Sequence, residues 1–168
     1  MPALISESEH LGNRSVCPST PNEQGPANDN LAWVEIARLP IAQMQDVLLA
    51  RIVGRTEAAK MDFPPAVLTR LATAISEITR NVVQHAGCPG EMRLGQVSAN
   101  DRKGLRIVVA DKGKGVERPE RFMEEGKIGT LGSGLPGARK LVDQFEIQSA
   151  PDAGTTVTME IWSVEATS

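Results

Sequence analysis

The sequence has little cysteine, no long hydrophobic run and no excess of positive charge. Its 168 residues include 18 lysines and arginines against 21 aspartates and glutamates. These charges are scattered, so the chain lacks the one-sided basic face that nucleic-acid binding needs. The apolar segment "VLLARIV" is interrupted by Arg51 and is far too short to span a bilayer. These absences argue against a nucleic acid or a membrane as the partner.

The amino end also lacks the basic segment and apolar core of a secretory signal, so we expect a soluble, cytoplasmic protein. The sequence contains two cysteines. Cys17 lies in a polar stretch and Cys88 in a Cys-Pro-Gly turn. Because a cytoplasmic compartment keeps thiols reduced, we expect both cysteines to be free thiols and Cys88 to be inert.

Composition divides the chain into an arm and one compact domain. Residues 1–30 are rich in proline, serine, asparagine and glycine, which predicts a disordered N-terminal arm. The chain as a whole is 40% hydrophobic, and residues 31–165 are long enough to bury a core. We therefore expect one domain over 31–165.

Hydrophobic periodicity predicts the elements of that domain. Strands are expected at 31–39, 91–98, 104–111, 145–150 and 155–162, with a long glycine-rich loop over 112–134. The strands at 91–98 and 104–111 are expected to form a hairpin. Helices are expected at 41–60, from just after Pro65 to a stop at Gly87, and at 135–145. The apolar stripe of the first helix contains Ile41, Met44, Leu48 and Ile52, and that of the second contains Val67, Leu71, Ile75, Ile78 and Val82. This order predicts an α+β fold, a two-layer sandwich with helices on one face of a mainly antiparallel sheet.

A first group of polar residues follows the strand at 104–111. Asp111 ends that strand and can accept a hydrogen bond from an exocyclic amine such as that of adenine. Gly113 and Gly115 would let the backbone approach a ring closely. An ordinary loop turn explains the same short pattern equally well.

A second group lies where the loop enters the third helix. Gly132, Gly134 and Gly137 would expose backbone N–H groups at the positive end of a helix, which suits phosphate. The spacing also fits the dinucleotide-binding fingerprint, but no βαβ unit follows, so we reject that reading. The sequence has no P-loop motif either.

A third group lies on the second helix, where Glu77 and Asn81 are one turn apart and share a face. Asn81 could complete the shell of a phosphate-bound Mg²⁺, and Glu77 could take a proton from an attacking hydroxyl. A solvated helix face is the alternative for this pair. Arg80 could contact a phosphate or form a surface salt bridge. His85 is expected to pack on the apolar stripe.

Four segments of the sequence, "EITRNVVQHA", "DKGKG", "GTLGSGLPG" and "GTTV", resemble the ordered nucleotide-binding motifs of the GHKL ATPase and kinase superfamily. The resemblance covers about residues 33–162. "EITRN" and "GLPGARKLVDQF" are more narrowly similar to the small anti-sigma and switch serine kinases of bacterial stress signalling, of the RsbT type.

The resemblance implies a Bergerat-type ATP pocket, Mg²⁺ and ATP as cofactors, and phosphorylation of a serine or threonine on a STAS-domain antagonist protein. It implies that Glu77 is the general base, Asn81 the magnesium ligand and Asp111 the adenine-reading carboxylate. The remaining matched positions are Gly113 and Gly115 beside the base, Gly132, Ser133, Gly134 and Leu135 in the phosphate-covering lid, and Thr155 beside the adenine.

Two other classes of protein share these motifs. One is a nucleotide-gated binding module that sequesters a sigma factor or activates a phosphatase by contact, without phosphate transfer. Intact Glu77 favours the kinase, because a pure binder needs no base. The other is a clamp ATPase, which uses a further transducer domain. Exposed faces of the first helix could also pair between two copies of the chain, so the sequence leaves open whether the protein is a homodimer.

Overall fold

The computed structural model describes residues 17, 32–122 and 134–163. The elements, in chain order, are β1 (Ala32–Ile41), α1 (Met44–Lys60), α2 (Pro65–Asn81), the π-helix η1 (Val82–Ala86), β2 (Gly90–Ala99), β3 (Arg102–Asp111), the 3-10 helix η2 (Pro119–Phe122), α3 (Gly134–Arg139), β4 (Gln144–Ser149) and β5 (Thr155–Trp162). The predicted arm, apart from Cys17, and residues 123–133 of the predicted loop lie outside the described residues. Within the described ranges, no helix is long and apolar enough to cross a bilayer.

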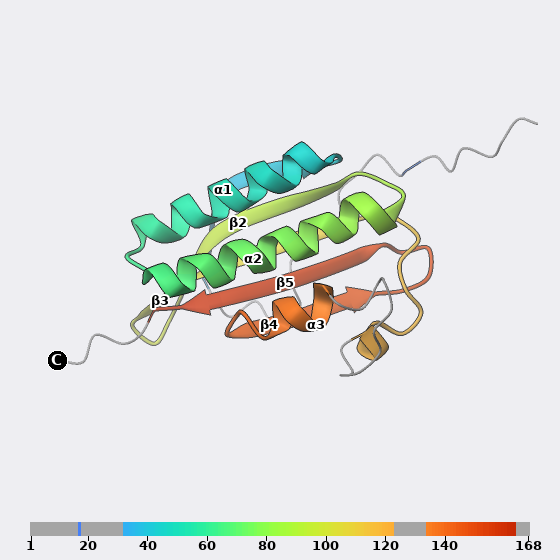
Figure 1. Cartoon of the computed structure of the whole chain (residues 1–168). Coiled ribbons are helices and arrows are strands. Elements are labelled where there is room, and N and C mark those ends of the chain that lie inside the picture. Colours follow the sequence, from blue (N-terminus) through green and yellow to red (C-terminus); the bar gives the residue numbers. More distant parts are fainter. Residues whose placement is uncertain (1–16, 18–31, 123–133, 164–168) are drawn as a thin grey trace, which may run out of the picture.

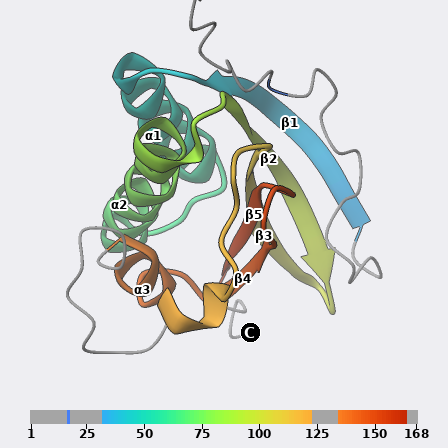
Figure 2. The same cartoon turned by 90° about the vertical axis from the view of Figure 1, so that its right-hand side faces the viewer.

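The strands form one antiparallel sheet in the order β1-β2-β3-β5-β4 (Figure 1). The predicted hairpin is present as β2 and β3, which pair from Gly90 opposite Asp111 to Ala99 opposite Arg102. Figure 2 shows α1, α2 and α3 together on one face of this sheet. The predicted two-layer α+β architecture is therefore confirmed.

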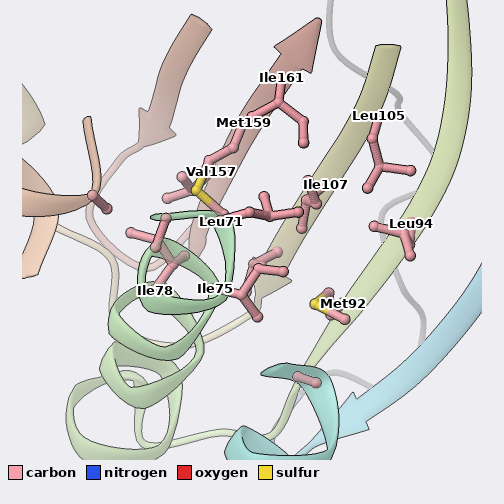
Figure 3. Packing of buried hydrophobic residues seen from close by; sticks show 14 of the residues in the cluster. Leu71, Ile75, Ile78, Met92, Leu94, Leu105, Ile107, Val157, Met159 and Ile161 are labelled. Carbon is pink, nitrogen blue, oxygen red and sulfur yellow. The ribbon is translucent and has the colours of Figure 1, made fainter. Parts of the chain in front are cut away.

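The centre of the core lies between α2 and the sheet. Leu71, Ile75 and Ile78 belong to the predicted stripe of α2 and are at most 2% exposed. They face a layer of side chains from β2, β3 and β5 (Figure 3), made of Met92, Leu94, Leu105, Ile107, Val157, Met159 and Ile161. Apolar residues spaced by three and four hold one face of a helix on a sheet. This packing fixes the rotation of α2 and thereby the direction of its polar residues.

The boundary between β1 and α1 differs from the prediction. The strand continues through Pro40 to Ile41, and the helix begins at Met44. Proline is tolerated here because β1 is an edge strand, which pairs among the described strands with β2 alone. The carboxylate of Asp46 accepts hydrogen bonds from the main-chain N–H groups of Ala42 and Gln43, at 2.9 and 3.0 Å. These bonds fix the start of α1 three residues later than the apolar pattern indicated.

The predicted apolar stripe is wrong for the residues that lie in α1, whereas Ile41 is buried but belongs to β1. Met44, Leu48 and Ile52 are 47%, 59% and 53% exposed. The buried face consists instead of Val47, Ala50, Gly54 and Ala58. A Cβ at position 54 would overlap the side chain of Ile75, so small residues let α1 pack closely on α2.

The third predicted helix is shorter than expected. α3 ends at Arg139, and β4 begins at Gln144. The main chain of Asp143 already donates to the carbonyl of Glu160 at 2.9 Å. Its carboxylate accepts from the N–H of Trp162 at 2.7 Å. Pairing with β5 therefore takes the residues that the sequence pattern assigned to the helix.

The prediction of two free thiols is wrong. Cys17 and Cys88 form a disulfide between residues 71 positions apart. Their Cα atoms are 5.8 Å apart, which lies within the range that a disulfide spans. The sequence could not reveal this pairing because it depends on where the arm meets the turn between η1 and β2.

Candidate nucleotide-binding site

A pocket of about 720 Å³, including the open space at its mouth, lies at the end of the sandwich where α2 stops and β3 ends. Its walls come from both layers and include Ile78, Val82, Val109, Leu135, Ile147 and Val157. Polar groups reach the same space from Asn81, His85, Asp111, Lys114 and Thr155. A largely apolar pocket with a few convergent polar groups is typical of a small-molecule site.

Asp111 is the half-buried acceptor of this pocket. Its Oδ1 accepts a hydrogen bond from the N–H of Gly113 at 2.9 Å. Burial raises the pKa of the Asp111 carboxyl above its ordinary value, although hydrogen bonds from the main chain of Gly113 and Thr155 act in the opposite direction. The fold thus holds a partly desolvated carboxylate among apolar side chains, where it can accept a hydrogen bond from a ligand amine.

Gly113 brings the loop after β3 against the end of η1. The N–H of Lys114 donates to the carbonyl of Ala86 at 3.2 Å. A Cβ at position 113 would overlap the main chain of Ala86. Ala86 and Lys114 both line the pocket. The close contact of Gly113 with the main chain of Ala86, which a Cβ would prevent, therefore sets the position of one pocket wall.

Gly113→Ala is therefore expected to lower the free energy of unfolding by about 1–3 kcal/mol, as overpacking does, and to weaken ATP binding by moving the pocket wall. Chemical denaturation and calorimetric titration with ATP measure the two effects. Gly137→Ala is the matched control for the stability measurement, because nothing lies within 4 Å of a Cβ there. A Gly113→Ala protein as stable as Gly137→Ala would contradict the close packing at Ala86.

Glu77 and Asn81 share the face of α2 that meets the start of α3. A Cβ at Gly134 would lie 3.2 Å from Glu77 Oε2 and 3.4 Å from the amide atoms of Asn81. Arg80 donates to Glu77 Oε1 at 3.0 Å within the helix. The two roles considered for Arg80 are a phosphate contact and a surface salt bridge, and the structure shows the salt bridge. The carboxylate and carboxamide together face the glycine segment that the sequence assigned to phosphate.

Most of the predicted site residues come together at this pocket. Asn81, Asp111, Gly115, Leu135 and Thr155 line it. Gly113 supports its wall, and Glu77 and Gly134 lie beside Asn81. Gly132 and Ser133 lie outside the described residues.

His85 is expected from the sequence to pack on the apolar stripe of the second predicted helix. It is half-buried and lines the pocket together with two residues of that stripe, Ile78 and Val82. The regular helix ends at Asn81 and continues as a π-helix to Ala86, followed by Gly87 in the left-handed conformation, at φ 75°. A π-helix changes the angular spacing of side chains, so the α-helical period alone does not fix the direction of His85.

An apolar pocket with an acceptor carboxylate, at one end of a two-layer sandwich, has the features of a small-molecule site. The chain belongs to the histidine kinase-like ATPase domain family, which it matches over residues 35–161. The pocket lies entirely within this range. The domain is thus an ATP-binding domain, and the resemblance to the GHKL superfamily is confirmed.

Two curated relatives show which members of this family the chain resembles. The chain is 37% identical over 119 residues to the serine/threonine-protein kinase RsbT of Bacillus subtilis, across 70% of this chain and 89% of that protein. It is 30% identical over 128 residues to an anti-sigma F factor of Caldanaerobacter subterraneus, across 71% and 87% of the two chains. These relatives confirm the resemblance to switch kinases and anti-sigma factors.

A solved structure supports the fold independently. A chain of RsbU and RsbW domains from Mycobacterium tuberculosis matches with a TM-score of 0.52 at 20% identity. The match covers 79% of the present chain and 33% of that chain, so the present chain spans one third of its length.

Proposed function

We propose that residues 31–165 form an ATP-dependent serine/threonine kinase that acts as a partner-switching regulator. The observation that carries this proposal is the meeting of Glu77 and Asn81 with Gly134, beside a pocket that is lined by the half-buried carboxylate of Asp111. A domain that used nucleotide only to set its shape would need the pocket but not the carboxylate of Glu77 beside it. The relation to a serine/threonine-protein kinase supports the same conclusion.

The roles that we propose for the residues are those that the resemblance implies. Asp111 accepts a hydrogen bond from the exocyclic amine of adenine, and Gly113, Gly115 and Thr155 are assigned to positions beside the base. The positions assigned to the phosphates are Gly132, Ser133, Gly134 and Leu135, of which the structure describes the last two. Glu77 orients the hydroxyl of the substrate protein and takes its proton as the phosphoryl group is transferred.

Asn81 fits a magnesium site. Its carboxamide is half-buried, lines the pocket and faces the start of α3. Mg²⁺ takes oxygen ligands, usually from one or two side chains together with phosphates and water. Asn81 would therefore hold Mg²⁺, which neutralises charge on the phosphates when bound. Because ATP is the phosphate donor, the reaction belongs in the cytoplasm.

The substrate that we propose is a serine or threonine on a STAS-domain antagonist protein, with a sigma factor or a phosphatase as a second partner. Similarity to both a switch kinase and anti-sigma F factors supports partners of this kind. Transfer of labelled γ-phosphate from Mg-ATP to a co-encoded STAS-domain protein tests the proposal.

Transfer is expected, and it should disappear when the acceptor serine or threonine of the STAS domain is replaced by alanine. Binding of the STAS protein and of ATP without any phosphate transfer would contradict the kinase proposal and would support a nucleotide-gated binding module instead. The alanine-substituted STAS protein should still bind, which separates loss of the acceptor from loss of the complex.

A further inference from the structure

The disulfide between Cys17 and Cys88 joins the arm to the nucleotide-binding domain. Cys88 lies inside the family match over residues 35–161, and Cys17 lies outside it. Both residues are partly exposed to solvent. A reductant of the thiol class can therefore reach a bond that the family domain alone does not contain.

The disulfide is fixed to the wall of the pocket through a short run of backbone. Cys88 is two residues beyond Ala86, which lines the pocket, and Gly87 between them makes the left-handed turn that ends η1. The carbonyl of Ala86 accepts the N–H of Lys114 at 3.2 Å. The backbone of Gly113, whose N–H holds Asp111, packs on the same residue. A displacement of the turn at Cys88 therefore reaches the loop that holds Asp111.

We propose that Cys17 and Cys88 form a thiol–disulfide exchange site that adjusts the affinity of the pocket for ATP. In the disulfide form, the cross-link holds the turn at Gly87 in place, and ATP binds more tightly. Reduction by a dithiol protein or by glutathione breaks the S–S bond. Two electrons and two protons convert the cysteines to thiols, and the reductant becomes a disulfide. Disulfides in a reducing compartment are usually transient and regulatory, which suits this role.

The effect of the disulfide on ATP affinity and the effect of ATP on the stability of the disulfide are thermodynamically linked. If the disulfide form binds ATP more tightly by some factor, ATP must stabilise the disulfide against reduction by the same factor. A threefold difference in affinity lowers the midpoint reduction potential of the cysteine pair by about 14 mV, since tenfold corresponds to about 30 mV for two electrons. The inference rests on the ATP-binding property of the family and not on phosphate transfer.

The experiment uses the full chain in two measurements. Calorimetry gives the ATP dissociation constant of the disulfide form and of the form reduced with dithiothreitol. Equilibration with mixtures of reduced and oxidised glutathione, followed by thiol trapping and mass spectrometry, gives the midpoint with and without saturating ATP. We expect the disulfide form to bind ATP at least threefold more tightly and ATP to shift the midpoint toward resistance to reduction.

Cys17→Ser is the matched variant, because it removes the cross-link at a residue outside the family domain. It should bind ATP like the reduced wild-type protein and should not respond to dithiothreitol. Circular dichroism of each form verifies that it is folded. Equal affinity of the two redox forms, no ATP binding by the disulfide form, or a midpoint that ATP leaves unchanged would each overturn the inference. Loss of phosphate transfer with the affinity shift intact would count only against the kinase.

Discussion

Glu77→Gln is expected to reduce phosphate transfer by about 100-fold to 10,000-fold, the usual contribution of a positioned general base. The substitution preserves the shape of the side chain but removes its ability to take a proton. Because the contact with Gly134 is at the edge of the pocket, the affinity for ATP should stay within about twofold of the wild-type value, a difference of less than 0.5 kcal/mol. Single-turnover transfer from labelled ATP and a separate binding titration measure the two quantities.

Glu57→Gln is the matched control for this variant. Glu57 pairs with Lys60 at 2.7 Å on α1, at the same i,i+3 spacing that joins Glu77 to Arg80. Both substitutions therefore break one helical ion pair and remove one negative charge. Transfer by Glu57→Gln should equal that of the wild type. A Glu77→Gln protein that still transfers phosphate at the wild-type rate would show that Glu77 is not the base.

Asp111→Asn is expected to lower ATP affinity by roughly 100-fold, or about 2.7 kcal/mol, the range of a hydrogen bond to a charged acceptor. The asparagine can turn its oxygen to Gly113 or to the ligand, but its NH2 group then opposes a donor on one side. The affinity of the wild-type protein should also fall as the pH decreases through the raised pKa of Asp111, because the protonated carboxyl is a poorer acceptor. Calorimetric titrations at several pH values test both statements, and the variant should lack this pH dependence.

Asp111→Asn should lower the affinity for ATP, but it should raise the free energy of unfolding. Burial raises the pKa of Asp111 in the folded protein, so folded molecules bind more protons than unfolded ones between the ordinary and the raised pKa. The contribution of Asp111 to stability is therefore present below this window and lost as the pH rises through it. At neutral pH, Asp111→Asn should unfold at a higher denaturant concentration than the wild type.

Asp152→Asn is the matched control for Asp111→Asn. Asp152 is exposed in the turn between β4 and β5, and its left-handed conformation, at φ 58°, also suits asparagine. This variant has the same change of net charge, and Asp152 does not line the pocket. If Asp152→Asn reproduced either effect, the cause would be net charge and not the half-buried carboxylate of Asp111.

The parts of the fold that large apolar residues determine could be predicted from the sequence. The stripe on α2 and the hairpin of β2 and β3 are both confirmed, because a regular period leaves one way to bury them. The same reasoning failed for α1, where Ala50, Gly54 and Ala58 are buried and the large residues Met44 and Leu48 are exposed. Close helix packing selects small residues, which a search for large apolar side chains passes over.

The candidate site could be predicted in outline because its residues follow the ends of regular elements. Asp111 at the end of β3 and Asn81 at the end of α2 meet because both elements stop at the same end of the sandwich. The disulfide and the π-helix that carries His85 could not be predicted. The first depends on a contact between segments 71 residues apart, and the second on a local change of helix type.

That change of helix type bears on how related chains are compared. A π-helix holds one residue more in its turn than an α-helix of the same height, and such turns are often found at functional sites. Val82–Ala86 is therefore a place where the length of the chain can drift by one residue while both flanking elements keep their form. Loss of a residue there would turn His85 away from the pocket without disturbing Asn81. Alignments of this domain should accordingly permit a gap between Asn81 and Gly87, and apparent differences at position 85 should be judged after that gap is placed.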